Sequence, residues 1–160
     1  MNLAEFNGME HSAAREELLR CCGSPQWAEQ MAALRPFATR AALLDAGDRI
    51  ADTLSREEWL TAFACHPRIG DRLAAGWSAT EQSGMATAGD TTVAALVSGN
   101  EEYEARFRHV FLICATNRSG DEMAAELQRR LTNDPDTELQ EAIREHRAIT
   151  ALRLTKLVDA

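Results

Sequence analysis

The stretch "DPDTELQEAIREHRAITALRLTKLV", residues 134–158, predicts one long helix with an apolar face. Asp134 is suited to the N-cap position, and Pro135 to the first helical position, where its missing N–H leaves no hydrogen bond unmade. Signals of the same kind recur along the chain, so we predict an all-α fold. The apolar residues of the stretch follow one helix face, and they are Leu139, Ile143, Ile149, Leu152 and Leu157.

The rest of the chain carries helix signals and few helix breakers. It has only four prolines and nine glycines, a composition that favours helix. Ser12 and Ser24 are predicted N-caps, and Ser55 begins a capping box. The helix from Ser55 should end at or next to His66, because Pro67 disfavours helical geometry in the residue before it. We expect a single domain over residues 1–160, a bundle of about eight helices: 12–22, 24–34, 39–54, 55–66, a short one after Ser78, 91–111 as one helix or as two broken near 98–100, 119–131 and 134–158.

Length, composition and charge limit the classes of protein to which this chain can belong. A chain of 160 residues with 45% apolar and 26% charged residues has the size and composition of one globular domain. The formal charge of −8 comes with both signs interspersed and no basic stripe, which argues against binding to nucleic acid. No run of 18 apolar residues exists, and residues 1–19 lack the basic start and apolar middle of a signal peptide. We therefore expect a cytoplasmic protein that does not enter a membrane.

The run "VFLICAT", residues 110–116, is apolar and rich in β-branched residues, yet it stands alone. A single strand has no partner with which to pair, so we interpret the run as a buried extended segment or a short helical turn. Its main-chain N–H and C=O groups then need partners from elsewhere. The segment is therefore a candidate for holding a ligand through its main chain.

Polar residues cluster in "FACHPRIGDRLAAGWSATEQSG", residues 63–84. His66 is either a residue that caps the end of a helix or an acid/base group. Ser78 and Glu81 have the spacing of a capping box, but Glu81 could instead point toward His66 and share proton transfer with it. Arg153, on the last helix, is either an amphipathic side chain that reaches solvent or a bidentate clamp on a substrate carboxylate. Local sequence does not decide between these alternatives.

The spacing of the histidines and cysteines gives little support for a metal site or a catalytic thiol. His66, Glu81 and His109 are possible metal ligands, but no HxxxH or HExxH pattern is present, so we predict no metal site. The four cysteines form no CxxC pair, and we expect them to be reduced and mostly buried. Cys65 and Cys114 could be nucleophiles, but nothing in the local sequence would lower the pKa of either thiol.

Together, the motifs resemble those of the OHCU (2-oxo-4-hydroxy-4-carboxy-5-ureidoimidazoline) decarboxylases of urate degradation. The order and spacing of HPxIG, SxxEQ, Y-x-x-x-F-x-x-x-F-x-I-C-A and a terminal LRL are specific, and the resemblance spans nearly the whole chain. The matching stretches are "FNGM" at 6–9, "LRPF" at 34–37, "HPRIG" at 66–70, "SATEQSG" at 78–84, "NEEYEARFRHVFLICAT" at 100–116, "RRLTNDPDTEL" at 129–139 and "ITALRL" at 149–154.

The resemblance implies a homodimeric bundle of helices that needs neither metal nor organic cofactor. It implies that OHCU loses CO2 to give S-(+)-allantoin, with His66 as the essential acid/base residue. Glu81 and Arg153 complete the implied catalytic group. Our hypothesis is that His66 and Glu81 together handle the protons, in an order that sequence does not settle, while Arg153 positions the substrate. The implied substrate contacts are Pro67, Ser78, Gln82 and the main chain of Phe111, Leu112, Ile113, Cys114 and Ala115.

Two stretches depart from the family pattern. Arg147 and Ala148 stand where a basic residue usually precedes the isoleucine, and "RFRHVF", residues 106–111, lacks the glycine and proline of many members. Both departures bear on the shape of the pocket more than on the type of reaction. Arg68 and Arg72 are expected to have surface or structural roles.

Two other functions are compatible with the residues alone. One is a non-catalytic helical interaction module whose polar cluster only caps helices, and such a module would have no concave site. The other is a metal-assisted hydrolase acting on imidazole-ring substrates, which would lose activity to a chelator.

Overall fold

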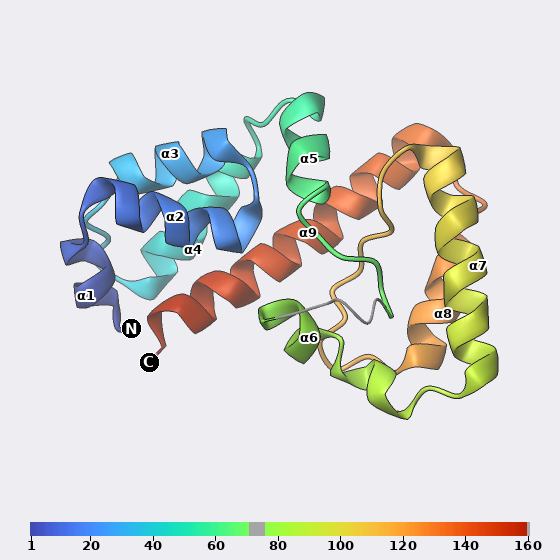
Figure 1. Ribbon diagram of the computed structural model, residues 1–160. Coiled ribbons are helices and arrows are strands. Elements are labelled where there is room, and N and C mark those ends of the chain that lie inside the picture. The colour runs from blue at the N-terminus through green and yellow to red at the C-terminus, as the bar shows by residue number, and fades with distance from the viewer. Residues whose placement is uncertain (71–75, 160) are drawn as a thin grey trace. The chain divides into compact units, whose positions relative to one another are not determined.

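A computed structural model describes residues 1–70 and 76–159, and it forms two compact units. The first unit comprises Met1–Ala62 and Arg147–Ala160, and the second comprises Phe63–His146. In the described ranges the regular elements are all helical, with one isolated bridge between Asn2 and Asp159, so the predicted all-α fold is confirmed (Figure 1). The elements are α1 (Leu3–Gly8), α2 (His11–Cys22), α3 (Pro25–Ala33), α4 (Arg40–Ala51), α5 (Arg56–Phe63), α6 (Trp77–Glu81), the 3-10 helix η1 (Ser83–Thr87), α7 (Asp90–Phe107), α8 (Gly120–Arg130) and α9 (Pro135–Val158).

The first unit packs α2 against α3 and α3 against α4. Trp27 of α3, which is 1% exposed, packs against α4, and its indole N–H donates to the Gly47 carbonyl at 2.9 Å. A Cβ at Gly47 would lie 3.2 Å from the Trp27 ring, so the absent side chain lets the indole approach the helix backbone. The predicted N-cap Ser24 is confirmed, because its hydroxyl accepts from the Trp27 amide at 3.0 Å.

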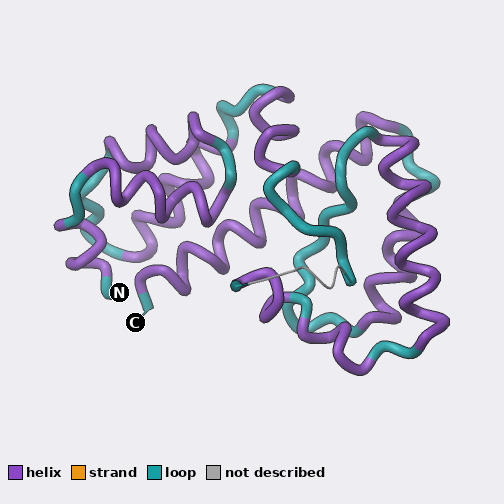
Figure 2. Tube along the Cα trace, viewed as in Figure 1, coloured by secondary structure: helices purple, strands orange, loops and turns teal. Residues whose placement is uncertain are grey.

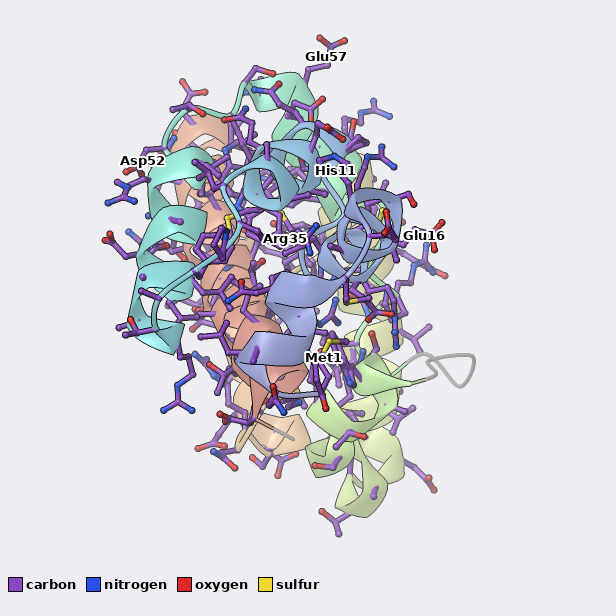
Figure 3. The ribbon with its side chains drawn as sticks, turned by 90° about the vertical axis from the view of Figure 1, so that its left-hand side faces the viewer. Met1, His11, Glu16, Arg35, Asp52 and Glu57 are labelled. Carbon is purple, nitrogen blue, oxygen red and sulfur yellow. The ribbon has the colours of Figure 1, made fainter. Side chains whose placement is uncertain are left out.

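Two of the sequence motifs contact each other in the first unit. From "LRPF", Arg35 donates to the carbonyls of Phe6 and Met9, the first and last residues of "FNGM", at 2.8 Å each. Asn7 exchanges two hydrogen bonds of 2.9 Å with the main chain of Phe37. Figure 3 shows Arg35 directed inward among the helices. The two motifs therefore have a structural role, holding α1 against the end of α3.

Two helix starts differ from the prediction. The sequence analysis missed α1, although Asn2 and Glu5 form a complete capping box whose N-x-x-E spacing could have revealed it. The predicted N-cap Ser12 is wrong, since α2 begins at His11 with Glu10 at its N-cap. The Ala14 amide donates to the Glu10 carbonyl, so the helical hydrogen bonds begin before Ser12.

In the second unit α7 and α8 pack side by side (Figure 1). Their contact is close at Gly99, where a Cβ would lie 2.6 Å from the Leu127 Cδ2. Of the two alternatives for this stretch, the single helix is confirmed: α7 runs unbroken through Gly99, where the missing side chain makes room for α8. The core of this unit comprises Leu96, Tyr103, Phe107, Phe111, Ile113, Met123, Leu127 and neighbours.

Two further boundaries in the second unit differ from expectation. α5 ends at Phe63, and the His66 amide donates back to the Phe63 carbonyl at 3.1 Å in the turn that follows. α6 has Gly76 as its N-cap, so Ser78 lies in the first turn and Glu81 is the last helical residue. The capping box of Ser78 and Glu81 is therefore wrong. Within the described ranges, we find no helix that combines the length and apolarity needed to cross a membrane.

Candidate functional site

His66 lines an open hollow on the second unit. The turn after α5 places it there, followed by Pro67. Arg68, which lines the same hollow, forms a bidentate ion pair with Glu104, and both N–O distances are 2.7 Å. Arg68 therefore has the structural role that we expected. The hollow is lined by His66, Pro67, Arg68, Glu104, Arg108, His109 and Val110.

Beside the hollow, His66 contacts a buried histidine of α9. The ring centroids of His66 and His146 are 4.9 Å apart, and the planes meet edge to face at 75°. His146 is fully buried and also packs near Phe63, with a centroid distance of 5.7 Å. The His66 ring is thus placed both by its own turn and by α9.

The segment of residues 110–116 runs without helix between α7 and α8 (Figure 2). The extended interpretation is confirmed, and charged side chains satisfy two of its main-chain groups. Arg130 donates to the Leu112 carbonyl at 2.6 Å, and the Cys114 amide donates to Glu145 at 2.7 Å. Glu145 and His146 are consecutive on α9, so this segment and His66 meet the same part of that helix.

The glutamine of "SATEQSG" joins that motif to "HPRIG". Its side-chain oxygen accepts from the Gly70 amide at 2.8 Å, and its side-chain nitrogen donates to the Arg68 carbonyl at 3.3 Å. Gln82 follows α6 directly as its C-cap residue. The structure thus brings the two motifs together, while the predicted contact of Gln82 with substrate stays a prediction. Arg72 lies outside the described residues.

Glu81 is 8% exposed, and its charge contributes to the electrostatics of the Cys114 thiol. Burial, chiefly, and the negative charges of Glu145 and Glu81 raise the pKa of Cys114 above its usual range. A thiol that stays protonated near neutral pH is a poor nucleophile. The raised pKa therefore argues against Cys114 as a nucleophile.

Arg153 belongs to the first unit, whereas His66 and Glu81 belong to the second. It is 7% exposed, and it donates to the Arg20 carbonyl at 3.2 Å. The interpretation of Arg153 as a side chain that reaches solvent is therefore wrong, because the residue is buried. Its action together with His66 and Glu81 stays a prediction.

The sequence analysis missed Glu104 and Arg108 as neighbours of His66. Three residues that line the hollow, Arg108, His109 and Val110, belong to "RFRHVF", the stretch that differs from the family pattern. That difference could have directed attention to the hollow. The other residue that differs from the family pattern, Arg147, pairs in the first unit with Asp48 and Asp52.

Over the described residues, no group of three His, Cys, Asp or Glu side chains is placed to hold a metal ion. The prediction of no cofactor stays a prediction.

Comparison with known proteins gives consistent matches. A family model described as OHCU decarboxylase matches residues 7–155. The uric acid degradation bifunctional protein TTL of Arabidopsis thaliana is 34% identical over 93% of this chain, and the chain spans only 48% of that relative. The 2-oxo-4-hydroxy-4-carboxy-5-ureidoimidazoline decarboxylase of Haloferax volcanii is 30% identical, with 83% of this chain and 81% of the relative covered. A crystal structure of OHCU decarboxylase in the presence of (S)-allantoin superposes with a TM-score of 0.82 at 33% identity, covering 91% of this chain and 99% of the other.

Proposed function

Because this chain belongs to the OHCU decarboxylase family, we propose that it is a carboxy-lyase that converts OHCU to (S)-allantoin in urate degradation, without a cofactor. The observation that carries the proposal is the placement of His66. It lines an open hollow, and it contacts α9 one residue from the point where α9 holds the main chain of Cys114. An acid/base residue beside a main-chain binding segment suits a small polar substrate.

The chemistry requires one stabilised intermediate and one directed proton. Loss of CO2 leaves an electron pair on the ring carbon, which the adjacent C=N or carbonyl system can delocalise. A proton must then reach one face of the neighbouring carbon, which bears the ureido group, to give one stereoisomer. The carbon that lost CO2 becomes a carbonyl as its hydroxyl proton leaves. In our proposal His66 is the main acid/base group, and it shares with Glu81 the transfer from the substrate hydroxyl and the delivery to carbon.

The remaining residues would bind and orient the substrate. Arg153 would bind the carboxylate through its planar guanidinium. The main chain of residues 111–115 would hold the ureido N–H and C=O groups, with Pro67, Ser78 and Gln82 as further contacts. Support for the segment comes from its burial and from the two anchors on Leu112 and Cys114.

Replacement of His66 tests the proposal. With freshly generated OHCU, the wild-type protein should produce optically active allantoin, followed by circular dichroism, well above the spontaneous rate. His66→Asn should lower kcat/KM by about 100-fold or more, since a positioned acid/base group contributes roughly that much. The matched control is His11→Asn, at an exposed hydrogen bond with Glu29, and it should keep full activity.

The possible outcomes separate the two parts of the proposal. A wild-type protein that does not accelerate the reaction would contradict the decarboxylase function. Full activity in a folded His66→Asn variant would contradict the role of His66 while leaving the function in place.

We further propose that residues 1–160 form one cooperative domain, which acts as a homodimer in the cytoplasm. α9 continues from the second unit into the first, which supports joint folding. None of the four cysteines, all of them in the described ranges, is in a disulfide, which suits a reducing compartment. Calorimetry should show a single unfolding transition, and sedimentation a mass of twice 17.6 kDa. Two separate transitions or a monomer mass would contradict these proposals.

A further inference from the structure

A buried ion pair lies behind the segment of residues 111–115. Arg130 and Glu138 are both fully buried, and Arg130 contacts the Glu138 carboxylate through two nitrogens at 2.5 and 2.9 Å. The Tyr103 hydroxyl donates to the same carboxylate, and Asn133 donates to it at 2.9 Å. This network connects the end of α8, the start of α9 and the middle of α7.

Burying such a pair is costly, and well-packed apolar side chains often stabilise a core equally well. Burial by itself would lower the pKa of Arg130, but the hydrogen bond and charge of Glu138 outweigh that effect and raise it. Burial and the hydrogen bond to Glu138 also raise the pKa of Tyr103 far above its usual range. Arg130 therefore stays charged and Tyr103 stays a hydrogen-bond donor.

The charge of Arg130 is directed at the segment. Besides its bonds to Glu138, it donates to the Leu112 carbonyl at 2.6 Å, and its guanidinium lies 4.8 Å from the centre of the Phe111 ring. The Tyr103 ring packs edge to face on Phe111 as well, with centroids 5.3 Å apart. Apolar side chains could fill this space, but they could not hold a carbonyl group.

A second charged side chain holds the segment two residues further on. The Cys114 amide donates to Glu145 at 2.7 Å, and Arg118 lies 3.5 Å from the other oxygen of Glu145. A carbonyl and an amide of one short segment are thus each fixed by a charged partner. Hydrogen bonds to ionised groups are stronger than neutral ones, so the main chain here is held more firmly than that of an ordinary loop.

We propose that Arg130, with Glu138 behind it, and Glu145 are positioning residues that hold the main chain of residues 111–115 in the conformation that binds the ureido group of the substrate. The inference rests on the proposed function, because it assigns these residues to binding at the same site. They act through the segment and do not touch the reacting atoms. Loss of an anchor should loosen a binding surface and leave the acid/base group His66 intact.

The kinetic constants distinguish this role from a merely structural one. Because the segment holds the substrate throughout the reaction, its loosening should raise KM with little change in kcat. Damage to the fold would instead reduce the fraction of active protein, which lowers kcat and leaves KM unchanged. A displacement of about 1 Å can cost up to about 100-fold, so we expect KM to rise about tenfold or more.

The principal variant is Arg130→Met combined with Glu138→Leu, which removes both charges and keeps apolar volume, so that no charge is left buried alone. It should stay folded, raise KM about tenfold or more and speed hydrogen–deuterium exchange in peptides covering residues 111–115. The matched control is Arg49→Met combined with Asp45→Leu, which removes an exposed ion pair on α4 and should change neither quantity.

A second pair of variants tests the other anchor, and it does so even if the double variant fails to fold. Glu145→Gln keeps an oxygen that can accept from the Cys114 amide, and it should raise KM less than Glu145→Leu, which has none. Equal KM values for these two variants and wild type, or a fall in kcat without a rise in KM, would overturn the inference. A wild-type protein without activity would contradict the proposed function instead, and the exchange measurement would still test the anchoring.

Discussion

Gly84 lies where the "SATEQSG" motif meets the turn after the segment of residues 111–115. A Cβ at this position would lie 1.9 Å from the Arg118 carbonyl oxygen, and contacts under 3.0 Å are essentially never seen. The obstacle is backbone, so Gly84→Ala must separate η1 from the turn by more than 1 Å. Gly89→Ala is the matched control, because a Cβ there would meet nothing within 4 Å.

The size of the effect follows from this displacement. Overpacking typically costs about 1–3 kcal/mol, and a backbone obstacle places Gly84→Ala near about 3 kcal/mol. For a chain of this length, that cost lowers Tm by about 6–12 °C. Because the turn directly follows residues 111–115, we also expect kcat/KM to fall about tenfold or more. Gly89→Ala, at the N-cap of α7, should cost less than about 1 kcal/mol and keep its activity.

Differential scanning calorimetry and decarboxylation assays on the two variants measure both effects. Equal Tm and equal kcat/KM for Gly84→Ala and Gly89→Ala would refute the reasoning. That result would mean that the turn yields without cost and that the position of η1 does not affect the site.

Two further predictions concern thiols and acid. A thiol reagent should label the exposed Cys65 in the native protein. Cys21 and Cys22 are buried and should react only after unfolding, in part because burial raises the pKa of Cys21 to about 12. Labelling of all three cysteines at one rate would contradict the packing of α2. Hydrogen bonds from Thr137, side chain first and then main chain, lower the pKa of Asp134, so its ionised form adds stability above the unfolded pKa of about 3.9 and loses it as pH falls through the lower folded value. In urea unfolding at several pH values, Asp134→Asn should be less stable than wild type at pH 7, with a gap that narrows in acid; a gap that does not change with pH would contradict this role.

Local sequence was sufficient at several helix ends, where the structure depends on neighbours within one or two turns. The N-caps Ser24 and Asp134 and the stop at Gly23 involve residues only a few positions apart. The same kind of spacing would have revealed α1 through Asn2 and Glu5. These local signals predicted the all-α fold, and the ordered motifs identified the family.

Local rules failed where a distant segment competes for the same residue. Gly99 suggested a break, but it is a contact point for Leu127 of α8. Ser78 and Glu81 have capping-box spacing, yet α6 begins before Ser78 and ends at Glu81. In both cases one residue type suits two structures, and at Gly99 packing against α8 selects between them.

The sequence by itself determined most of the helical segments, because caps and helix periodicity are properties of short stretches. It also determined the family, because the order and spacing of the motifs can be read along the chain. Only the tertiary structure decided which motifs meet. Asn7 joins "FNGM" to "LRPF", Gln82 joins "HPRIG" to "SATEQSG", and Arg130 and Glu145 hold "FLICA" from α8 and α9. These partners lie between 12 and 31 residues apart along the chain. At such separations residue spacing no longer restricts direction or distance, and the packing of the helices sets both.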